Sequence, residues 1–346
     1  MLGANRTIQG ESEMAGSAAA AKPDWQALLA GGLDARRLHA IADRLGSAHQ
    51  AAPAGDAKAF GAALERLATS PAQRDELAHH RPQLARRAAA GRVRAFDGGP
   101  ADMLFALAGL LEPVLRGGLA SEANLLANRY LDVHPQGATG WALLPLYLSL
   151  HANEAGDADL ADALLAPARP RLVVVGGLSG TGKSSLARLL ASRIGRPPGG
   201  RMLRWDVFRK RLDGLPPETR LAPRHYTRAK DDRTYEALFE SADDHLSCGN
   251  SVILDAVFMN RSERDVAEAL ATHHRVPFTG LWLEAPERDR IARVTARSGD
   301  ASDADEKVAR EQSRRSVGEI HWHRIRANRP QELIVAAARA ALDRTA

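Results

Sequence analysis

The sequence predicts an α/β fold in residues 170–346, with three α/β/α layers around a parallel sheet, preceded by a mostly α-helical domain in residues 25–165. After residue 170, short β-branched runs alternate with longer segments of helical spacing, as in a parallel sheet covered by helices. Before residue 165, apolar residues recur at three- and four-residue steps and β-branched runs are few. The 346 residues are also enough for two domains of ordinary size.

Composition excludes several classes of protein. Apolar residues make up 45% of the chain and charged residues 26%, which rules out a wholly disordered or fibrous protein. The single cysteine, Cys248, excludes an intrachain disulfide framework and a four-thiolate zinc site, and it favours a reducing compartment. No apolar run approaches the roughly 18 residues that span a bilayer. Residues 1–24 lack the pattern of a secretory signal. We therefore expect a disordered tail there and a cytoplasmic protein without a membrane partner.

Residues 25–165 are expected to form a compact helical bundle. Helical spacing is clearest in 28–45, 102–115 and 123–131. Clusters of glycine and proline at 98–100, 117–118 and 135–137 are expected to separate the helices.

Five runs after residue 170 have the β-branched or apolar character of buried strands. The strand candidates are 172–175, 202–205, 252–254, 278–283 and 322–325. The helix candidates are 183–194, 233–247, 261–272, 287–295, 305–315 and 331–343. Because open parallel sheets bind ligands at the carboxyl ends of their strands, we expect the chemistry just after Val175, Trp205, Leu254 and Leu283.

A glycine-rich loop follows the first of these strands and matches G-x-x-x-x-G-K-[ST]. The residues expected to bind the phosphates of ATP are Gly177, Leu178, Ser179, Gly180, Thr181, Gly182, Lys183, Ser184 and Ser185. Glycines let successive backbone N–H groups point at an anion, and the following helix adds its positive end. Lys183 would reach the β- and γ-phosphates, and the Ser184 hydroxyl would bind Mg²⁺. A flexible glycine turn is a poor alternative, because the loop joins a buried strand to an amphipathic helix.

Asp255 ends the apolar run 252–254, as the acidic residue of a Walker B segment does. It would act on Mg²⁺ directly or through water. The alternative is a structural turn or cap carboxylate. The next residue is Ala256 and not the glutamate that activates water in motor ATPases, and no N-K-x-D guanine motif is present. These two absences favour transfer to an acceptor over hydrolysis and over a GTPase switch.

Asp206 is expected to end the second strand, facing the phosphates, where its carboxylate could accept the proton of an attacking hydroxyl. Arg209 follows at a spacing that could bring it to an anionic or polar group of the substrate. The alternative is a structural helix cap at Asp206 and a solvent-facing Arg209.

Arg293 and Arg297 are four residues apart, so they share one face of the predicted helix 287–295 and its extension. The polar break Ser298-Gly299-Asp300 follows and could hinge a lid. Two guanidinium groups over the γ-phosphate would neutralise charge in the transition state. The alternative is a solvated basic face.

These segments resemble the P-loop kinases of the phage polynucleotide kinase type, the AAA-33 group. In the family's order, the matching segments are GGLSGTGKSS (176–185), WDVFRKRL (205–212), SVILDAVFMNRSERD (251–265) and RVTARSGDASDAD (293–305). The matches cover about half of the chain, from residue 170 onward. The resemblance implies a P-loop NTPase domain with a five-stranded parallel sheet and an arginine-bearing lid. It also implies Asp206 as the general base, Arg209 as a substrate contact and Arg297 as the lid arginine.

A second resemblance concerns the rest of the chain. The D-A-V-F segment at 255–258 looks like the ATP-binding part of bifunctional aminoglycoside phosphotransferase/ATP-binding proteins. Residues 38–49, 91–94 and 123–150 then look like parts of the C-terminal lobe of aminoglycoside phosphotransferases. The chain departs from that family because no histidine of this region is followed by Gly-Asp, so the H-G-D catalytic loop is missing. We therefore expect 25–165 to be a degenerate, inactive remnant with a structural or substrate-gating role.

Charge is unevenly distributed. Residues 1–169 contain 16 Lys and Arg against 18 Asp and Glu, a net charge of −2, and residues 170–346 contain 31 against 24, a net charge of +7. The second part is where an anionic ligand is expected, and its cations are mostly arginines, which suit phosphate. Free use of arginine by a GC-rich genome would give the same excess.

Together these features predict an ATP-dependent kinase that moves the γ-phosphoryl group of ATP, with Mg²⁺, to a hydroxyl of a small-molecule or nucleotide acceptor. One alternative is an ATP-binding switch or scaffold with no acceptor. Another is a 5′-hydroxyl polynucleotide kinase, but aromatic residues are only 5% of the chain, so nucleic acid is a less favoured partner. The sequence makes no prediction of the oligomeric state.

Overall fold

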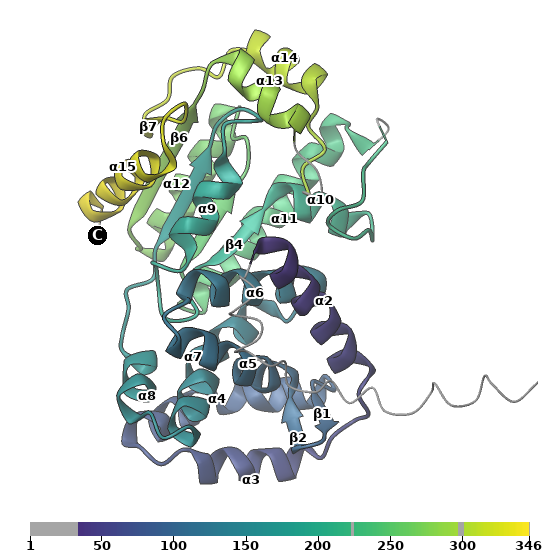
Figure 1. Cartoon of the computed structure of the whole chain (residues 1–346), viewed down its shortest axis with the longest axis vertical. Coiled ribbons are helices and arrows are strands. Elements are labelled where there is room, and N and C mark those ends of the chain that lie inside the picture. Colours follow the sequence, from purple (N-terminus) through teal and green to yellow (C-terminus); the bar gives the residue numbers. More distant parts are fainter. Residues whose placement is uncertain (1–33, 223–224, 297–300, 346) are drawn as a thin grey trace, which may run out of the picture.

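The computed structural model describes residues 34–222, 225–296 and 301–345 (Figure 1). The predicted tail at 1–24 lies outside these residues. The part before residue 166, here called the helical half, forms one end of the molecule. Its helices are α2 (Ala35–Ala51), α3 (Ala57–Leu67), α4 (Pro71–Ala89), α5 (Met103–Arg116), α6 (Ala120–Val133), α7 (Gly137–Glu154) and α8 (Ala158–Leu165).

The mostly α-helical character of this half is confirmed, with one short hairpin that the sequence did not predict. Strands β1 (Val93–Phe96) and β2 (Gly99–Asp102) pair antiparallel as a short hairpin. Residues 98–100, expected to be only a break, form its turn and second strand, because Gly99 adopts φ +106°. Asp102 then caps α5 and forms a buried ion pair with Arg87, with an N–O distance of 2.7 Å, which fixes the hairpin to α4.

Residues 172–345, here called the sheet half, form a five-stranded parallel sheet in the order β4-β5-β3-β6-β7. The strands are β3 (Leu172–Gly176), β4 (Arg201–Arg204), β5 (Val252–Asp255), β6 (Phe278–Glu284) and β7 (His323–Arg326). The helices are α9 (Lys183–Ala191), α10 (Trp205–Leu212), α11 (Arg228–Ser247), α12 (Arg261–His274), α13 (Glu287–Ala296), α14 (Glu306–Arg314) and α15 (Gln331–Arg344).

Alternation along β3 shows how the layers form. Val173 and Val175 point to one face, where they pack with apolar residues of α9 and α15. Leu172 and Val174 point to the other face, where they pack with α11 and α12. Both faces of the sheet are therefore covered, and the predicted α/β/α fold of a P-loop NTPase is confirmed. The helical half has a separate core of its own.

One predicted element boundary is wrong in a way that matters for the site. The second strand ends at Arg204, not at Trp205, and α10 begins directly after it. Asp206 therefore lies in the first turn of α10 and not at the end of the strand. A carboxylate is favourable there because it faces the positive end of the helix dipole.

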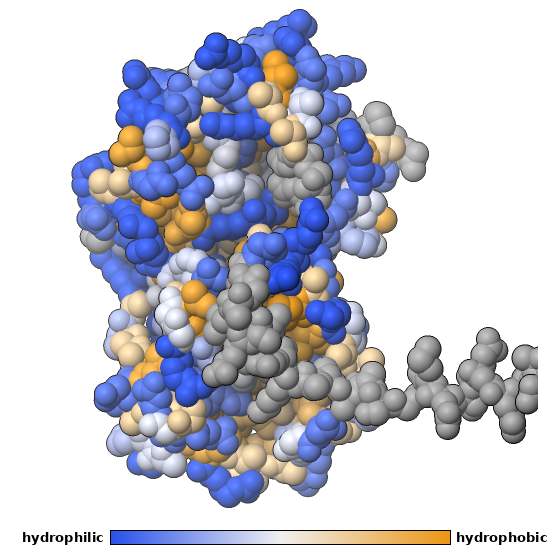
Figure 2. All heavy atoms as spheres, viewed as in Figure 1, coloured by the Kyte–Doolittle hydropathy of each residue, from blue (hydrophilic) through white to orange (hydrophobic). Residues whose placement is uncertain are grey.

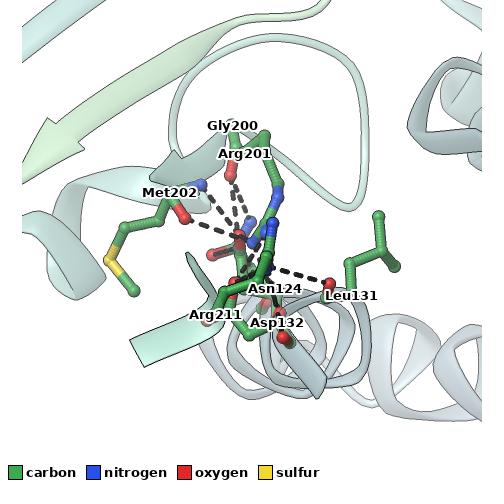
Figure 3. A network of polar contacts seen from close by, with 8 residues as sticks. Asn124, Leu131, Asp132, Gly200, Arg201, Met202 and Arg211 are labelled. Carbon is green, nitrogen blue, oxygen red and sulfur yellow. Dashed lines mark hydrogen bonds and ion pairs between the residues drawn. The ribbon is translucent and has the colours of Figure 1, made fainter. Parts of the chain in front are cut away.

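A buried polar network joins the two halves (Figure 3). The Oδ1 atom of Asn128 in α6 accepts hydrogen bonds from the backbone N–H of Met202, at 2.8 Å, and from the guanidinium of Arg201, at 2.7 Å. Arg201 also forms an ion pair with Asp132, with an N–O distance of 2.6 Å. Asn124 donates to the carbonyl of Gly200 at 3.0 Å. Strand β4 is thereby fixed to α6.

We expect Arg201→Ala to lower the free energy of unfolding by about 3 kcal/mol, since it removes the closest cation of Asp132 and a donor to Asn128 Oδ1 and leaves only the more distant guanidinium of Arg211, at 3.9 Å. Only 2% of Arg201 is exposed. Urea denaturation measures the loss. The control is Arg81→Ala, which removes an exposed ion pair with Glu65 and should cost less than about 1 kcal/mol. Equal losses in the two variants would contradict a stabilising role for this network.

Candidate functional site

The glycine-rich loop lies at the carboxyl edge of the sheet, between the end of β3 and the start of α9. Gly177, Gly180 and Gly182 all adopt positive φ, at +135°, +83° and +93°. A Cβ on Gly177 would lie 2.5 Å from the carbonyl oxygen of Leu283, and one on Gly180 would lie 2.4 Å from that of Arg290. The glycines are therefore required by backbone conformation and by close packing against the sheet and α13.

Hydrogen bonds hold the loop in this shape. The carbonyl of Leu178 accepts from the Thr181 hydroxyl at 2.8 Å and from Lys183 Nζ at 3.2 Å. The backbone N–H of Ser179 donates to Oε1 of Gln312 in α14 at 2.7 Å. Gly182 precedes α9 and brings no capping side chain, so the first turn of this helix faces the loop with its positive end. A loop of this form suits the phosphates of a nucleotide.

Gly180→Ala is expected to distort this loop. The methyl group would meet the Arg290 backbone, and the positive φ is unfavourable for alanine, so we expect a loss of about 1–3 kcal/mol in stability and weaker nucleotide binding. Thermal unfolding and calorimetric titration with ATP would measure the two effects. Gly61→Ala is the control, because its Cβ would meet nothing within 4 Å in α3. An unchanged ATP affinity in the Gly180 variant would show that the loop does not bind the nucleotide.

The two side chains predicted as Mg²⁺ ligands, Ser184 and Asp255, both accept hydrogen bonds from one guanidinium group, that of Arg204. Asp255 is the last residue of β5 and pairs in register with Val175 of β3, so it lies next to the loop. The guanidinium of Arg204, at the end of β4, donates from Nε to Asp255 Oδ2 and from Nη2 to Ser184 Oγ, both at 3.2 Å. Hydroxyl and carboxylate oxygens are ligands that Mg²⁺ prefers. Ser184 and Asp255 therefore fit a magnesium site.

The other serine of the pair lies elsewhere. Ser185 is exposed and faces the helical half. It lines a cavity of about 240 Å³ with Arg188 of α9 and with Leu38 and Ser121. Ser185 thus faces the cavity beside the helical half, whereas Ser184 contacts Arg204, the residue that also contacts Asp255.

Helix α13 presents two arginines to the loop. Arg293 donates from Nη1 to the carbonyl oxygen of Gly180 at 3.3 Å and from Nη2 to that of Ala327 at 2.7 Å. Arg290, one turn earlier, is buried and donates to the Ser179 carbonyl at 3.2 Å. Arg297 lies outside the described residues. The predicted position of Arg293 next to the phosphate loop is thus found, and the structure adds Arg290 as a support of the loop.

Arg209 is buried and held by several groups. Its guanidinium lies over the rings of Trp205 and Tyr226, at 4.2 and 4.7 Å from their centroids. It donates to the His225 carbonyl at 2.7 Å and forms an ion pair with Asp231. Burial lowers the pKa of Arg209. The alternative of a solvent-facing Arg209 is therefore wrong. In this conformation the guanidinium orders the segment around residue 225.

Asp206 is half-buried beside this cluster. The pKa of Tyr226 is raised, mainly because the side chain is partly buried and also because the carboxylates of Asp303 and Asp206 lie nearby. The Tyr226 hydroxyl donates to Asp303 at 2.6 Å, and Lys210 forms an ion pair with the same carboxylate at 3.1 Å. The segment that contains Asp303, just after residues 297–300, is thereby joined to α10. Asp206 lies within a compact group of aromatic and charged side chains at the carboxyl edge of the sheet.

The comparison with protein families agrees with this geometry. Residues 172–317 match the family model described as an AAA domain. That range runs from the start of β3 to just past α14, so the matched residues include the phosphate loop, Arg204, Asp206, Asp255 and Arg293. The match agrees with the α/β/α fold described above.

Curated relatives match over a similar length. "Uncharacterized protein Rv2004c" of Mycobacterium tuberculosis (strain ATCC 25618 / H37Rv) is 31% identical over 183 residues, which cover 52% of this chain and 36% of that protein. "Uncharacterized protein Mb2027c" of Mycobacterium bovis shows the same values. The chain thus spans about a third of the length of the curated relatives it matches.

Solved structures with a similar arrangement include three kinases. A gluconokinase from Sinorhizobium meliloti 1021 has a TM-score of 0.38 at 22% identity and covers 51% of this chain and 94% of its own. A sugar kinase from Janibacter sp. HTCC2649 has 0.39 at 22%, covering 50% and 95%. The Mycobacterium tuberculosis APS kinase CysC, in complex with AMPPNP and APS, has 0.34 at 20%, covering 51% and 98%.

Sequence reasoning missed Arg204, Arg290 and Gln312 in the sheet half. A signal for the first was present: the run R-M-L-R places an arginine at each end of a short buried strand, and buried charges need partners. Those partners lie 20 and 51 residues away in the sequence, so they could be identified only from the folded structure.

Across the described residues no helix is long and apolar enough to cross a bilayer. Figure 2 shows a largely hydrophilic surface on this face of the sheet half.

Proposed function

We propose that the protein is an ATP-dependent phosphotransferase that moves the γ-phosphoryl group of ATP to a hydroxyl of a small-molecule or nucleotide acceptor. One observation carries this proposal: Ser184, at the end of the phosphate loop, and Asp255 both accept hydrogen bonds from the guanidinium of Arg204, and Asp206 follows the neighbouring strand. A nucleotide-phosphate cradle, a metal ligand pair and a candidate base therefore share the carboxyl edge of the sheet.

In the proposed reaction the loop N–H groups and Lys183 bind the β- and γ-phosphates. Asp206 accepts the proton of the acceptor hydroxyl as its oxygen forms a bond to the γ-phosphorus, and the bond from that phosphorus to the bridging oxygen of ADP breaks. Arg293, already hydrogen-bonded to the loop, and Arg297 would neutralise charge on the transferred group. Mg²⁺, held by Ser184 and Asp255, would supply further charge neutralisation on the phosphates.

The phosphoryl acceptor is best sought by transfer of labelled γ-phosphate from ATP to nucleosides, oligonucleotides, sugars and aminoglycosides. Transfer to at least one hydroxyl compound, lost in Asp206→Asn, is the expected result. Slow hydrolysis with no acceptor, together with a partner protein bound only in the presence of ATP, would favour the alternative of an ATP-binding switch. Transfer to 5′-hydroxyl oligonucleotides with steep salt dependence would favour a polynucleotide kinase.

The role proposed for residues 25–165 is structural or substrate-gating, as a domain separate from residues 170–346. Support comes from the separate core of the helical half and from its polar contacts with β4, the strand that leads into α10. Its likeness to a degenerate aminoglycoside phosphotransferase lobe stays a prediction. ATP turnover at the wild-type rate in full-length Lys183→Ala, retained when Asp255→Asn is added, would point to an active site in the helical half and contradict this role.

A further inference from the structure

The guanidinium of Arg204 occupies an unusual position for a cationic side chain. It lies at the carboxyl end of β4, and only 6% of the residue is exposed. Two of its hydrogen bonds, to Asp255 Oδ2 and Ser184 Oγ, use the same oxygens that would bind Mg²⁺. Asp255 is equally buried, at 5% exposed, so its carboxylate needs a cation in the absence of a metal ion.

A guanidinium and a divalent cation compete for these oxygens. Their positive charges repel strongly where water is largely excluded, so each cation lowers the affinity of the two oxygens for the other. We therefore expect the guanidinium to give up these contacts when Mg²⁺ binds.

The strand that bears Arg204 is poorly placed to move as a whole. Arg201 and Met202, at its other end, are fixed to Asn128 of α6 by hydrogen bonds of 2.7 and 2.8 Å (Figure 3). A change at Arg204 is consequently expected in its side chain, which has several rotatable bonds, and not in the strand.

We propose that Arg204 is an internal competitor of Mg²⁺. In the nucleotide-free protein it holds Ser184 and Asp255 in place, and it leaves these two oxygens when ATP and Mg²⁺ bind. The strength of its contacts then sets the Mg²⁺ concentration that nucleotide binding requires. This inference rests on the proposed function, because it takes Ser184 and Asp255 as the metal ligands.

The test compares full-length wild type with Arg204→Gln, which retains a polar side chain without the charge. Calorimetric titration with a nonhydrolysable ATP analogue at several Mg²⁺ concentrations gives the Mg²⁺ concentration at half-maximal binding. We expect this value to fall about tenfold or more in the variant, because a charged hydrogen-bonding competitor has been removed. Without nucleotide, MgCl₂ alone should raise the unfolding temperature of Arg204→Gln more than that of wild type.

Arg324→Gln is the matched control. Arg324 is also a strand arginine paired with a carboxylate, Glu284 at 2.9 Å, but it is exposed, so its Mg²⁺ dependence should equal that of wild type. If Arg204→Gln fails to fold, Arg204→Lys keeps the charge with a single donor group, and a fall of smaller size is expected.

Three results would overturn the inference. They are an unchanged Mg²⁺ requirement, a higher one, or loss of nucleotide binding at every Mg²⁺ concentration, which would make Arg204 a phosphate ligand. Failure of the proposed function looks different: wild type would bind no nucleotide. The titration with MgCl₂ alone would then still test whether Arg204 competes with the metal ion.

Discussion

Lys183→Ala is expected to reduce ATP affinity or turnover by about 10²–10³-fold or more, as loss of a preorganised phosphate contact does. In the structure Lys183 Nζ donates to the Leu178 carbonyl at 3.2 Å, so the ammonium group lies over the loop. The same carbonyl also accepts from the Thr181 hydroxyl at 2.8 Å, so the loop keeps a support when Lys183 is removed. The loss would therefore report on the phosphate contact. Calorimetric titration with ATP and Mg²⁺ measures it.

The control for this variant is Lys58→Ala. Lys58 is an exposed lysine of α3 in the helical half, so its removal changes the net charge equally and should leave ATP binding intact. If Lys183→Ala bound ATP as wild type does, the glycine-rich loop would not be the nucleotide site and the proposed function would be wrong.

Asp206→Asn is expected to separate binding from chemistry. Asparagine preserves the size of the side chain but cannot accept the proton, so the rate of phosphoryl transfer should fall by roughly 10²–10⁴-fold. ATP affinity should stay within about twofold, because the triphosphate contacts come from the loop and α9. Single-turnover transfer of labelled phosphate to the identified acceptor and equilibrium binding of ATP measure the two quantities.

A matched carboxylate serves as the control here. Asp265 is exposed on α12 and faces Arg261 at 3.6 Å, so Asp265→Asn should change neither quantity. Full transfer activity in Asp206→Asn would show that another group takes the proton. A parallel loss of ATP binding would instead place Asp206 in the nucleotide site.

The sequence predicted the parallel sheet and its phosphate loop because those features are local. A β-branched run, glycines at fixed spacing and a following amphipathic helix occupy neighbouring positions, and each follows from backbone preferences. Asp255 was also located correctly at the end of its strand. The start of α10 was missed, because Trp205 suits a strand as well as the first turn of a helix.

The features that the sequence did not reveal depend on distant partners. Arg204 bridges residues that come from β5 and from the start of α9, and Ser179 is bonded by Gln312, 133 residues away. Hairpin β1–β2 packs through Asp102 against Arg87. Each depends on contacts that exist only once the chain has folded, so a pattern of residue types cannot specify them.

Strand β4 is the outermost strand on its side of the sheet, and such a border normally leaves backbone groups open to pairing with a foreign chain. Here the outward N–H of Met202 and carbonyl of Gly200 are occupied by the side-chain amides of Asn128 and Asn124, one helical turn apart on α6. Two asparagines thus hydrogen-bond two backbone groups that a further strand would otherwise pair with. The helical half protects the protein against edge-to-edge aggregation at this border, whatever else it contributes.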